Sequence, residues 1–184
     1  MTNIFSYSLS DFSMVSTEVI ADMYLRYLES IFPLPILFLV INIFSVWLIF
    51  KKPSWVLIYL ALGYVFIGLV FFPGFYNELN SSGKVFQALF LVQALLLAIK
   101  GIKHLNKNKD FKLYNIGFIV FVISMLVPFS FFLSKTKELL LVSGYGPDQI
   151  ALSTLGLCVL LFNSKKDFLY LIVPVLWLLN SFLI

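Results

Sequence analysis

The chain has 184 residues, of which 61% are hydrophobic and 12% are charged, with a formal net charge of +4. A soluble domain averages about 25% charged residues, so this composition excludes a single soluble core and requires lipid to cover the apolar surface. The lysines lie in loops and not on one basic face, which argues against a nucleic-acid partner. The single cysteine, Cys158, and the single histidine, His104, argue against a disulfide, a metal site or a bound cofactor.

Residues 11–30 have the pattern of an amphipathic helix on the outer membrane surface. Its polar stripe holds Glu18, Asp22, Arg26 and Glu29, and the opposite face holds Phe12, Val19, Ile20, Met23, Tyr24 and Tyr27. Residues 1–30 lack the basic start and the short apolar run of a cleaved signal peptide, so we expect the N-terminus to be retained. Such a helix either caps the bundle or forms a lid over an outward-facing cavity.

Six apolar runs follow, each about long enough to cross a bilayer, for which a helix needs roughly 20 residues. They cover residues 31–50, 54–72, 85–102, 113–133, 149–163 and 168–184. Because backbone groups in lipid must bond within their own segment, and the runs are too uniformly apolar for barrel strands, we predict helices. The expected fold is an all-α, six-transmembrane-helix bundle preceded by one surface helix, with residues 1–184 in a single membrane domain.

The lysines alternate between the connections. Nine basic residues lie on one side of the predicted spans, and four lie on the other. The first set is Lys51, Lys52, Lys100, Lys103, Lys107, Lys109, Lys112, Lys165 and Lys166, and the second is Arg26, Lys84, Lys135 and Lys137. The positive-inside rule places the first set in the cytoplasm and both termini outside. We expect a bacterial inner-membrane location.

No charged residue lies in the middle of a predicted span, which argues against a proton-coupled pump and against acid–base chemistry at membrane depth. The uncharged polar residues within the spans are Asn42, Tyr64, Gln87, Gln93, Ser124, Ser153, Thr154 and Asn180. Hydrogen bonds between transmembrane helices contribute about 0.6–2 kcal/mol each, and helix packing is the simplest role for these residues.

The segment from Gly144 to Gln149 is the most distinctive local sequence, because its glycines and proline predict a tight turn before the fifth span. Asp148 then stands at the start of a helix, where Asp is a preferred cap. The alternative role is membership of a polar cluster at the outer end of the bundle. Its other candidate members are Gln149, Gln87, Asn180, Tyr76, Asn77 and Glu29.

Several segments together resemble an uncharacterised bacterial family of small, six-span membrane proteins. The resemblance rests on Asp11-Phe12, on Tyr27 and Pro33, on Phe86-Gln87-Ala88-Leu89-Phe90 with Gln93, on Pro147-Asp148, on Thr154-Leu155-Gly156, and on Pro174 with Trp177. It implies a six-span bundle over nearly the whole chain and implies no activity.

Three functions remain open at this stage. The first is small-molecule binding or transport through an outward-facing polar cavity near Asp148. The second is a structural or accessory role, with the polar residues packing helices against each other, a partner membrane protein or a second copy. The third is a lipid-modifying enzyme with an outer-surface site using Glu29, Glu78 or Asp148, although the absence of acid–base pairs within the spans argues against it.

Overall fold

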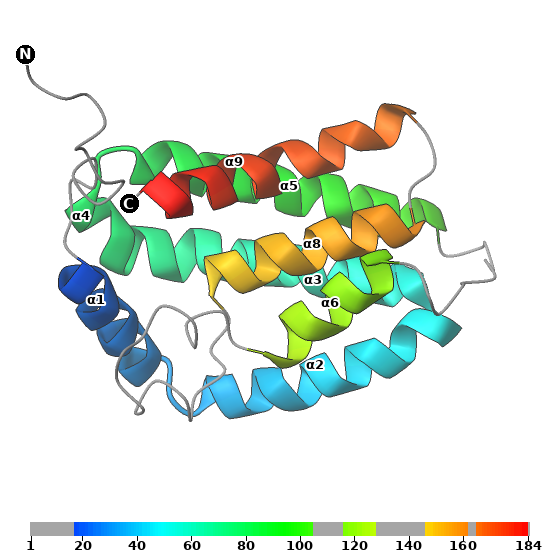
Figure 1. Ribbon diagram of the computed structural model, residues 1–184, viewed down its shortest axis with the longest axis horizontal. Helices are drawn as coiled ribbons and strands as arrows, with labels where there is room; N and C mark the ends of the chain where they lie inside the picture. Colours follow the sequence, from blue (N-terminus) through cyan, green and yellow to red (C-terminus); the bar gives the residue numbers. More distant parts are fainter. Residues whose placement is uncertain (1–16, 105–115, 128–145, 162–164, 184) are drawn as a thin grey trace, which may run out of the picture.

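A computed structural model describes residues 17–104, 116–127, 146–161 and 165–183. Within these ranges the protein is all-helical and contains no strand. The elements are α1 (Thr17–Ser30), α2 (Leu34–Lys51), α3 (Pro53–Phe66), η3 (Ile67–Tyr76), α4 (Asn77–Leu79), α5 (Gly83–His104), α6 (Ile116–Leu126), α8 (Pro147–Leu161), η5 (Lys165–Phe168) and α9 (Leu169–Leu183). The long helices lie lengthwise beside one another, and α1 crosses one end of them (Figure 1).

The helices coincide with the predicted apolar runs but differ from them at the ends. Helix α2 begins at Leu34 instead of residue 31; Pro33 is its N-cap residue, and Pro35 lies in its first turn, where proline is tolerated. Helix α8 begins at Pro147 instead of residue 149, because proline suits the start of a helix. The run predicted at 113–133 is described only over 116–127, and the remainder lies outside the described residues.

The run predicted at 54–72 continues as helix well past its expected end. The wide π-helix η3 follows α3 without a break, and α4 extends the helical structure to Leu79. Pro73 lies inside η3 and has no backbone N–H to donate, which explains a local departure from α-helical bonding. The result is that the side chains of Phe71, Phe72 and Tyr76 all face the core.

Three helical segments are long and apolar enough to cross a membrane, judged by length and composition. They are Leu34–Lys51, Pro53–Leu79 and Gly83–Lys103. The other apolar helices, Ile116–Leu126, Pro147–Leu161 and Leu169–Ser181, are shorter. The fold is therefore compatible with a membrane location, while the number of spans stays a prediction.

Burial along α2 runs opposite to the order found in water-soluble proteins. Asn42 and Ser45 are buried, with 0% and 2% exposure, whereas Phe44 and Trp47 are each 54% exposed. The Asn42 side-chain oxygen accepts a hydrogen bond from the Tyr59 hydroxyl at 2.7 Å. Apolar side chains outside and hydrogen-bonded polar side chains inside are what lipid, and not water, selects on a helix surface.

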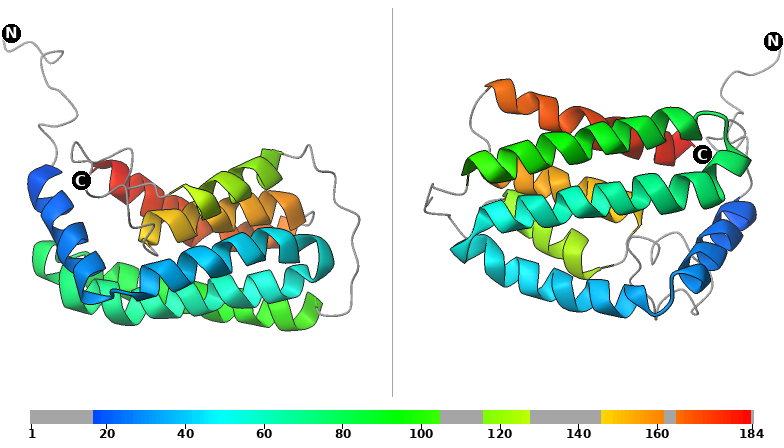
Figure 2. Two further views of the ribbon diagram at one scale, coloured as in Figure 1. Left: turned by 90° about the horizontal axis from the view of Figure 1, so that it is seen from below. Right: turned by 180° about the vertical axis from the view of Figure 1, so that it is seen from behind.

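Helices α6 and α8 lie side by side in both views of Figure 2 and approach each other at two glycines. A Cβ atom at Gly156 would lie 2.5 Å from the Phe121 nitrogen, and one at Gly117 would lie 2.7 Å from the Gly156 carbonyl oxygen. Only glycine permits this backbone approach. This crossing fixes α8, and with it the position of Asp148.

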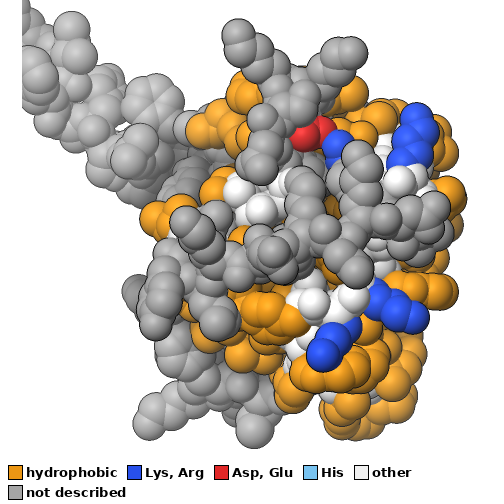
Figure 3. All heavy atoms as spheres, turned by 90° about the vertical axis from the view of Figure 1, so that its right-hand side faces the viewer, with side chains coloured by type: hydrophobic (Ala, Val, Ile, Leu, Met, Phe, Trp, Pro, Cys, Tyr) orange, Lys and Arg blue, Asp and Glu red, His pale blue; other side chains and the backbone are white. Residues whose placement is uncertain are grey.

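The two ends of the bundle differ in charge. One end, which we call the α1 end, holds α1, α4, the starts of α5 and α8 and the end of α9 (Figure 1). The other, which we call the lysine end, holds the basic residues Lys51, Lys52, Lys100 and Lys103; Figure 3 shows basic side chains scattered there among apolar ones.

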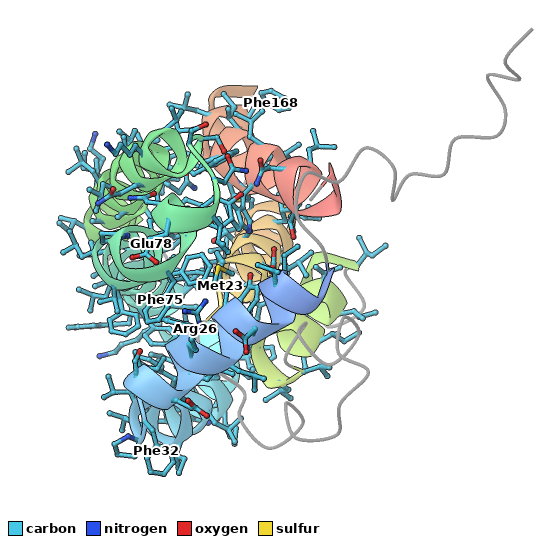
Figure 4. All side chains as sticks on the ribbon, turned by 90° about the vertical axis from the view of Figure 1, so that its left-hand side faces the viewer. Met23, Arg26, Phe32, Phe75, Glu78 and Phe168 are labelled. Carbon is cyan, nitrogen blue, oxygen red and sulfur yellow. The ribbon has the colours of Figure 1, made fainter. Side chains whose placement is uncertain are left out.

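The predicted surface helix is described from residue 17 onward, so Phe12 and the Asp11-Phe12 pair lie outside the described residues. Asp22, Arg26 and Glu29 are exposed, as the amphipathic pattern predicts, and Met23 and Tyr27 are buried. Val19, expected on the buried face, is 40% exposed. Figure 4 shows α1 lying across this end, with Met23 directed toward the bundle.

Candidate functional site

Asp148 lies in the first turn of α8 and is only 6% exposed. Its Oδ2 atom accepts a hydrogen bond from the Tyr24 hydroxyl of α1 at 2.9 Å. Its Oδ1 atom accepts one from Nε1 of Trp177 in α9, also at 2.9 Å. The Ser181 side chain lies beside the same carboxylate. One carboxylate thus joins three helices that are far apart in the sequence.

Aromatic rings pack around the two residues, Trp177 and Tyr24, that donate to this carboxylate. The indole of Trp177 makes edge-to-face contacts with Phe72, Tyr76, Phe86 and Phe90 at centroid distances of 5.2–5.6 Å. On the α1 side, the Tyr24 ring lies 5.5 Å from that of Phe71. Aromatic pairs at these distances stabilise packing beyond the area they bury. The shell keeps water away from the charged group and holds Trp177 in its donating orientation.

Tyr76 connects a second polar group to this site. Its hydroxyl accepts hydrogen bonds from Asn180 Nδ2 at 2.8 Å and from Asn80 Nδ2 at 3.4 Å. Asn77, the residue after Tyr76, donates a hydrogen bond from Nδ2 to Gln87 Oε1 at 3.3 Å. The structure therefore brings Asp148, Tyr76 and Asn180 together through Trp177, with the Asn77–Gln87 pair adjoining them.

Two residues expected in the outer cluster lie elsewhere. Gln149 is buried against α6, where its Nε2 atom donates to the Met125 carbonyl oxygen at 3.3 Å. A single step along an α-helix turns a side chain by about 100°, so neighbours at 148 and 149 face different helices. Glu29 is exposed on the outer face of α1. Neither residue contributes to the Asp148 site.

Burial, and next to it the negative charge of Asp148, raise the pKa of Tyr24 well above its ordinary value of 10. The hydroxyl consequently keeps its proton at neutral pH and remains the donor in the contact with Asp148.

The other polar residues within the helices lie between helices. Ser124 and Ser153 share a hydrogen bond of 2.9 Å across the α6–α8 contact, and Thr154 Oγ1 donates to the Ile150 carbonyl oxygen at 2.8 Å. Gln93 Nε2 donates to the Tyr170 carbonyl oxygen of α9 at 2.9 Å. Among the described residues, the buried polar atoms without a hydrogen-bond partner are Asn42 Nδ2, Tyr64 Oη, Asn77 Oδ1, Gln93 Oε1 and Gln149 Oε1.

Sequence reasoning missed an ion pair near the lysine end. Lys100 was expected in the loop after the third span, but it lies in the last part of α5, where Nζ pairs with Asp167 of η5. The two side chains are 18% and 11% exposed, and the ammonium also lies 5.4 Å from the centre of the Tyr170 ring. The spacing of seven residues from Gln93 to Lys100 is about two helical turns and places both side chains on one face of a helix. This spacing could have indicated that Lys100 belongs to the helix and not to the loop. Tyr24 was expected only on the apolar face of the surface helix, and the sequence did not place Trp177 in the polar cluster.

The fold and site together define an all-helical protein whose apolar helices are compatible with a membrane location. Residues 17–182 match a family of unknown function (DUF6064), and the chain belongs to this family. No curated protein and no solved structure matches the chain. In the part of the chain that the structure describes, no group of three or more His, Cys, Asp or Glu side chains could hold a metal ion.

Proposed function

We propose that the protein is a six-span integral membrane protein that binds a small molecule at the α1 end of its bundle for transport across the bilayer. Asp148 anchors the ligand, and α1 acts as a movable cover. The α1 end faces outward from the bacterial inner membrane in this proposal, because the positive-inside rule assigns the lysine end to the cytoplasm.

The observation that carries the proposal is the environment of Asp148. A carboxylate is expensive to place in an apolar bundle, and such groups in membrane proteins mark ligand and ion sites. Here one of its side-chain hydrogen-bond partners, Tyr24, belongs to α1, a helix that lies across the bundle end and exposes its polar face. Withdrawal of α1 would free Oδ2 while Trp177 continued to hold Oδ1.

Polar groups continue through the bundle from the α1 end to the lysine end. On α5 they are Gln87, Gln93 and Lys100, which span about 20 Å at 1.5 Å per residue. Gln93 Oε1, which lies between the two ends, has no hydrogen-bond partner among the described residues. Buried polar atoms that lack protein partners are expected where water or a passing ligand supplies the hydrogen bond, which supports transport over binding alone.

A structural or accessory role is the second candidate. It is favoured by the fact that both Asp148 oxygens already accept hydrogen bonds from the protein, as in a fixed polar lock between helices. In that case the core stays dry and α1 does not move.

Cysteine accessibility distinguishes the two functions. In a Cys158→Ser background, single cysteines replace Gln93 and Thr154, which are buried, and Val92, whose side chain is 52% exposed on the outer face of α5. A membrane-impermeant thiol reagent is then added to each side of sealed vesicles. Transport predicts labelling at 93 and 154 and none at 92, because lipid covers position 92. Absence of labelling at 93 and 154 would refute transport and leave the structural role.

A further inference from the structure

We propose that the ligand taken up at the Asp148 site is a small organic cation, an alkylamine or quaternary ammonium compound. This inference rests on the proposed binding function and adds the chemical class of the ligand. It is carried by the charge of the site, by its aromatic walls and by the residues around its entrance.

In the part of the chain that the structure describes, no basic side chain pairs with Asp148. Within the described ranges the ion pairs are Arg26 with Asp22 and Lys100 with Asp167, and neither involves Asp148. Its side-chain partners, the Tyr24 and Ser181 hydroxyls and the Trp177 indole, are all neutral groups. Neutral donors offset only part of the cost of burying a carboxylate, and an opposite charge offsets more. A cationic ligand supplies the missing charge, whereas an anion would be repelled.

The walls of the site suit an organic cation better than a hydrated metal ion. Tyr24 fills the space between the carboxylate and Phe71, so that its departure would leave a space of about the size of its ring. That space would be bounded by the Asp148 carboxylate and by the connected rings of Phe71, Tyr76 and Trp177, whose neighbouring centroids are 5.9 and 5.3 Å apart. Aromatic faces attract alkylammonium groups and offer no oxygen ligands for a metal.

The entrance carries acidic side chains that would raise the local concentration of cations. Asp22 and Glu29 of α1 and Glu78 of α4 are all exposed at this end. Two basic side chains also lie at this end: Arg26, which is paired with Asp22 at 3.6 Å, and Lys84, which is exposed in the first turn of α5. Figure 4 shows Arg26 and Glu78 on the face of the bundle that α1 crosses. Acidic groups near a site steer cations toward it and slow the approach of anions.

The test uses the full-length protein in lipid nanodiscs and isothermal titration with three probes of similar shape. These are choline, its neutral isostere 3,3-dimethylbutan-1-ol, and the anion 3,3-dimethylbutanoate. The inference predicts binding of choline and at least about tenfold weaker binding of the other two, since one charge-assisted contact accounts for about one order of magnitude. Equal binding of the neutral isostere, or no binding of choline, would overturn it.

Two variants assign the binding to Asp148. Asp148→Asn preserves the shape of the side chain and is expected to weaken choline binding about tenfold. Asp22→Asn, at an exposed carboxylate that is paired with Arg26 and screened by solvent, should have a much smaller effect. Tyr24→Phe removes the hydroxyl that competes for Oδ2 and is expected to tighten binding, an effect that a merely structural role would not produce. If neither Asp148→Asn nor Tyr24→Phe changes the affinity for choline, the inference is overturned. Binding of the neutral isostere at an Asp148-dependent site would overturn the cation class alone, whereas failure of the cysteine test would overturn the transport function itself.

Discussion

The contact between Tyr24 and Asp148 gives the most informative prediction about stability. Tyr24→Phe removes one hydroxyl and keeps the ring that packs 5.5 Å from Phe71. Hydrogen bonds to charged groups contribute about 1.5–3 kcal/mol, and the partner oxygen here lies in a side chain that is 6% exposed. We therefore expect the free energy of unfolding in detergent micelles to fall by about 1.5–3 kcal/mol.

A double-mutant cycle with Asp148→Asn separates this hydrogen bond from other effects of the substitutions. Unfolding is followed by denaturant titration of the wild type, both single variants and the double variant. The structure predicts that Tyr24→Phe costs much less in the Asp148→Asn background, with a coupling free energy above about 1 kcal/mol. Additive effects of the two substitutions would show that the hydroxyl and carboxylate do not interact, and would refute the reasoning.

The same contact has a defined pH dependence. Folding raises the pKa of Tyr24 above its ordinary value of 10, so at pH above 10 the unfolded chain loses this proton before the folded chain does. The contribution of Tyr24 is therefore complete below pH 10 and is lost as the pH rises toward its folded-state pKa. The fall in stability above pH 10 should be smaller for Tyr24→Phe, and an identical fall in both proteins would contradict the assignment.

Two further substitutions test the packing and the second charged site. Gly156→Ala places a Cβ atom 2.5 Å from the Phe121 nitrogen and should lower the free energy of unfolding by about 1–3 kcal/mol. The control Gly74→Ala, where a Cβ atom would have no neighbour within 4 Å, should lower it far less. Equal losses in denaturant titrations would contradict the α6–α8 crossing. Lys100→Met removes the ammonium that pairs with the largely buried Asp167 carboxylate and should lower the free energy of unfolding by about 3–5 kcal/mol. The double variant Lys100→Met with Asp167→Leu should restore most of this loss, and a double variant as unstable as the single one would contradict the ion pair.

Much of the helical arrangement could be predicted from the sequence, because length and apolar composition dominate there. Proline marks the starts of α2, α3 and α8, as expected from its tolerance in a first helical turn. The end of the second run could not be placed, because the π-helical bonding around Pro73 extends the helix where proline ordinarily suggests a stop.

The candidate site was predictable in its location but not in its contacts. Topology alone brings Asp148, Asn180 and Tyr76 to one end of the bundle. The rotation of each helix about its own axis decides which side chains meet, and that rotation is set by contacts such as the glycine crossing of α6 and α8. For this reason the sequence suggested Gln149 as a member of the Asp148 cluster and did not place Trp177 in it.

The proposal that α1 covers a site reached from water is tested most directly by the labelling rate of a buried cysteine. Thr154→Cys in the Cys158→Ser background is treated with an impermeant thiol reagent, with Tyr24 intact and with Tyr24→Phe. Val159→Cys, at a 48% exposed position on the outer face of α8, is the matched control that lipid should protect. We expect labelling at 154 to accelerate when the Tyr24 hydroxyl is removed, with no labelling at 159. An unlabelled cysteine at 154 in both backgrounds would contradict a movable cover and identify the Tyr24–Asp148–Trp177 contact as a fixed part of the fold.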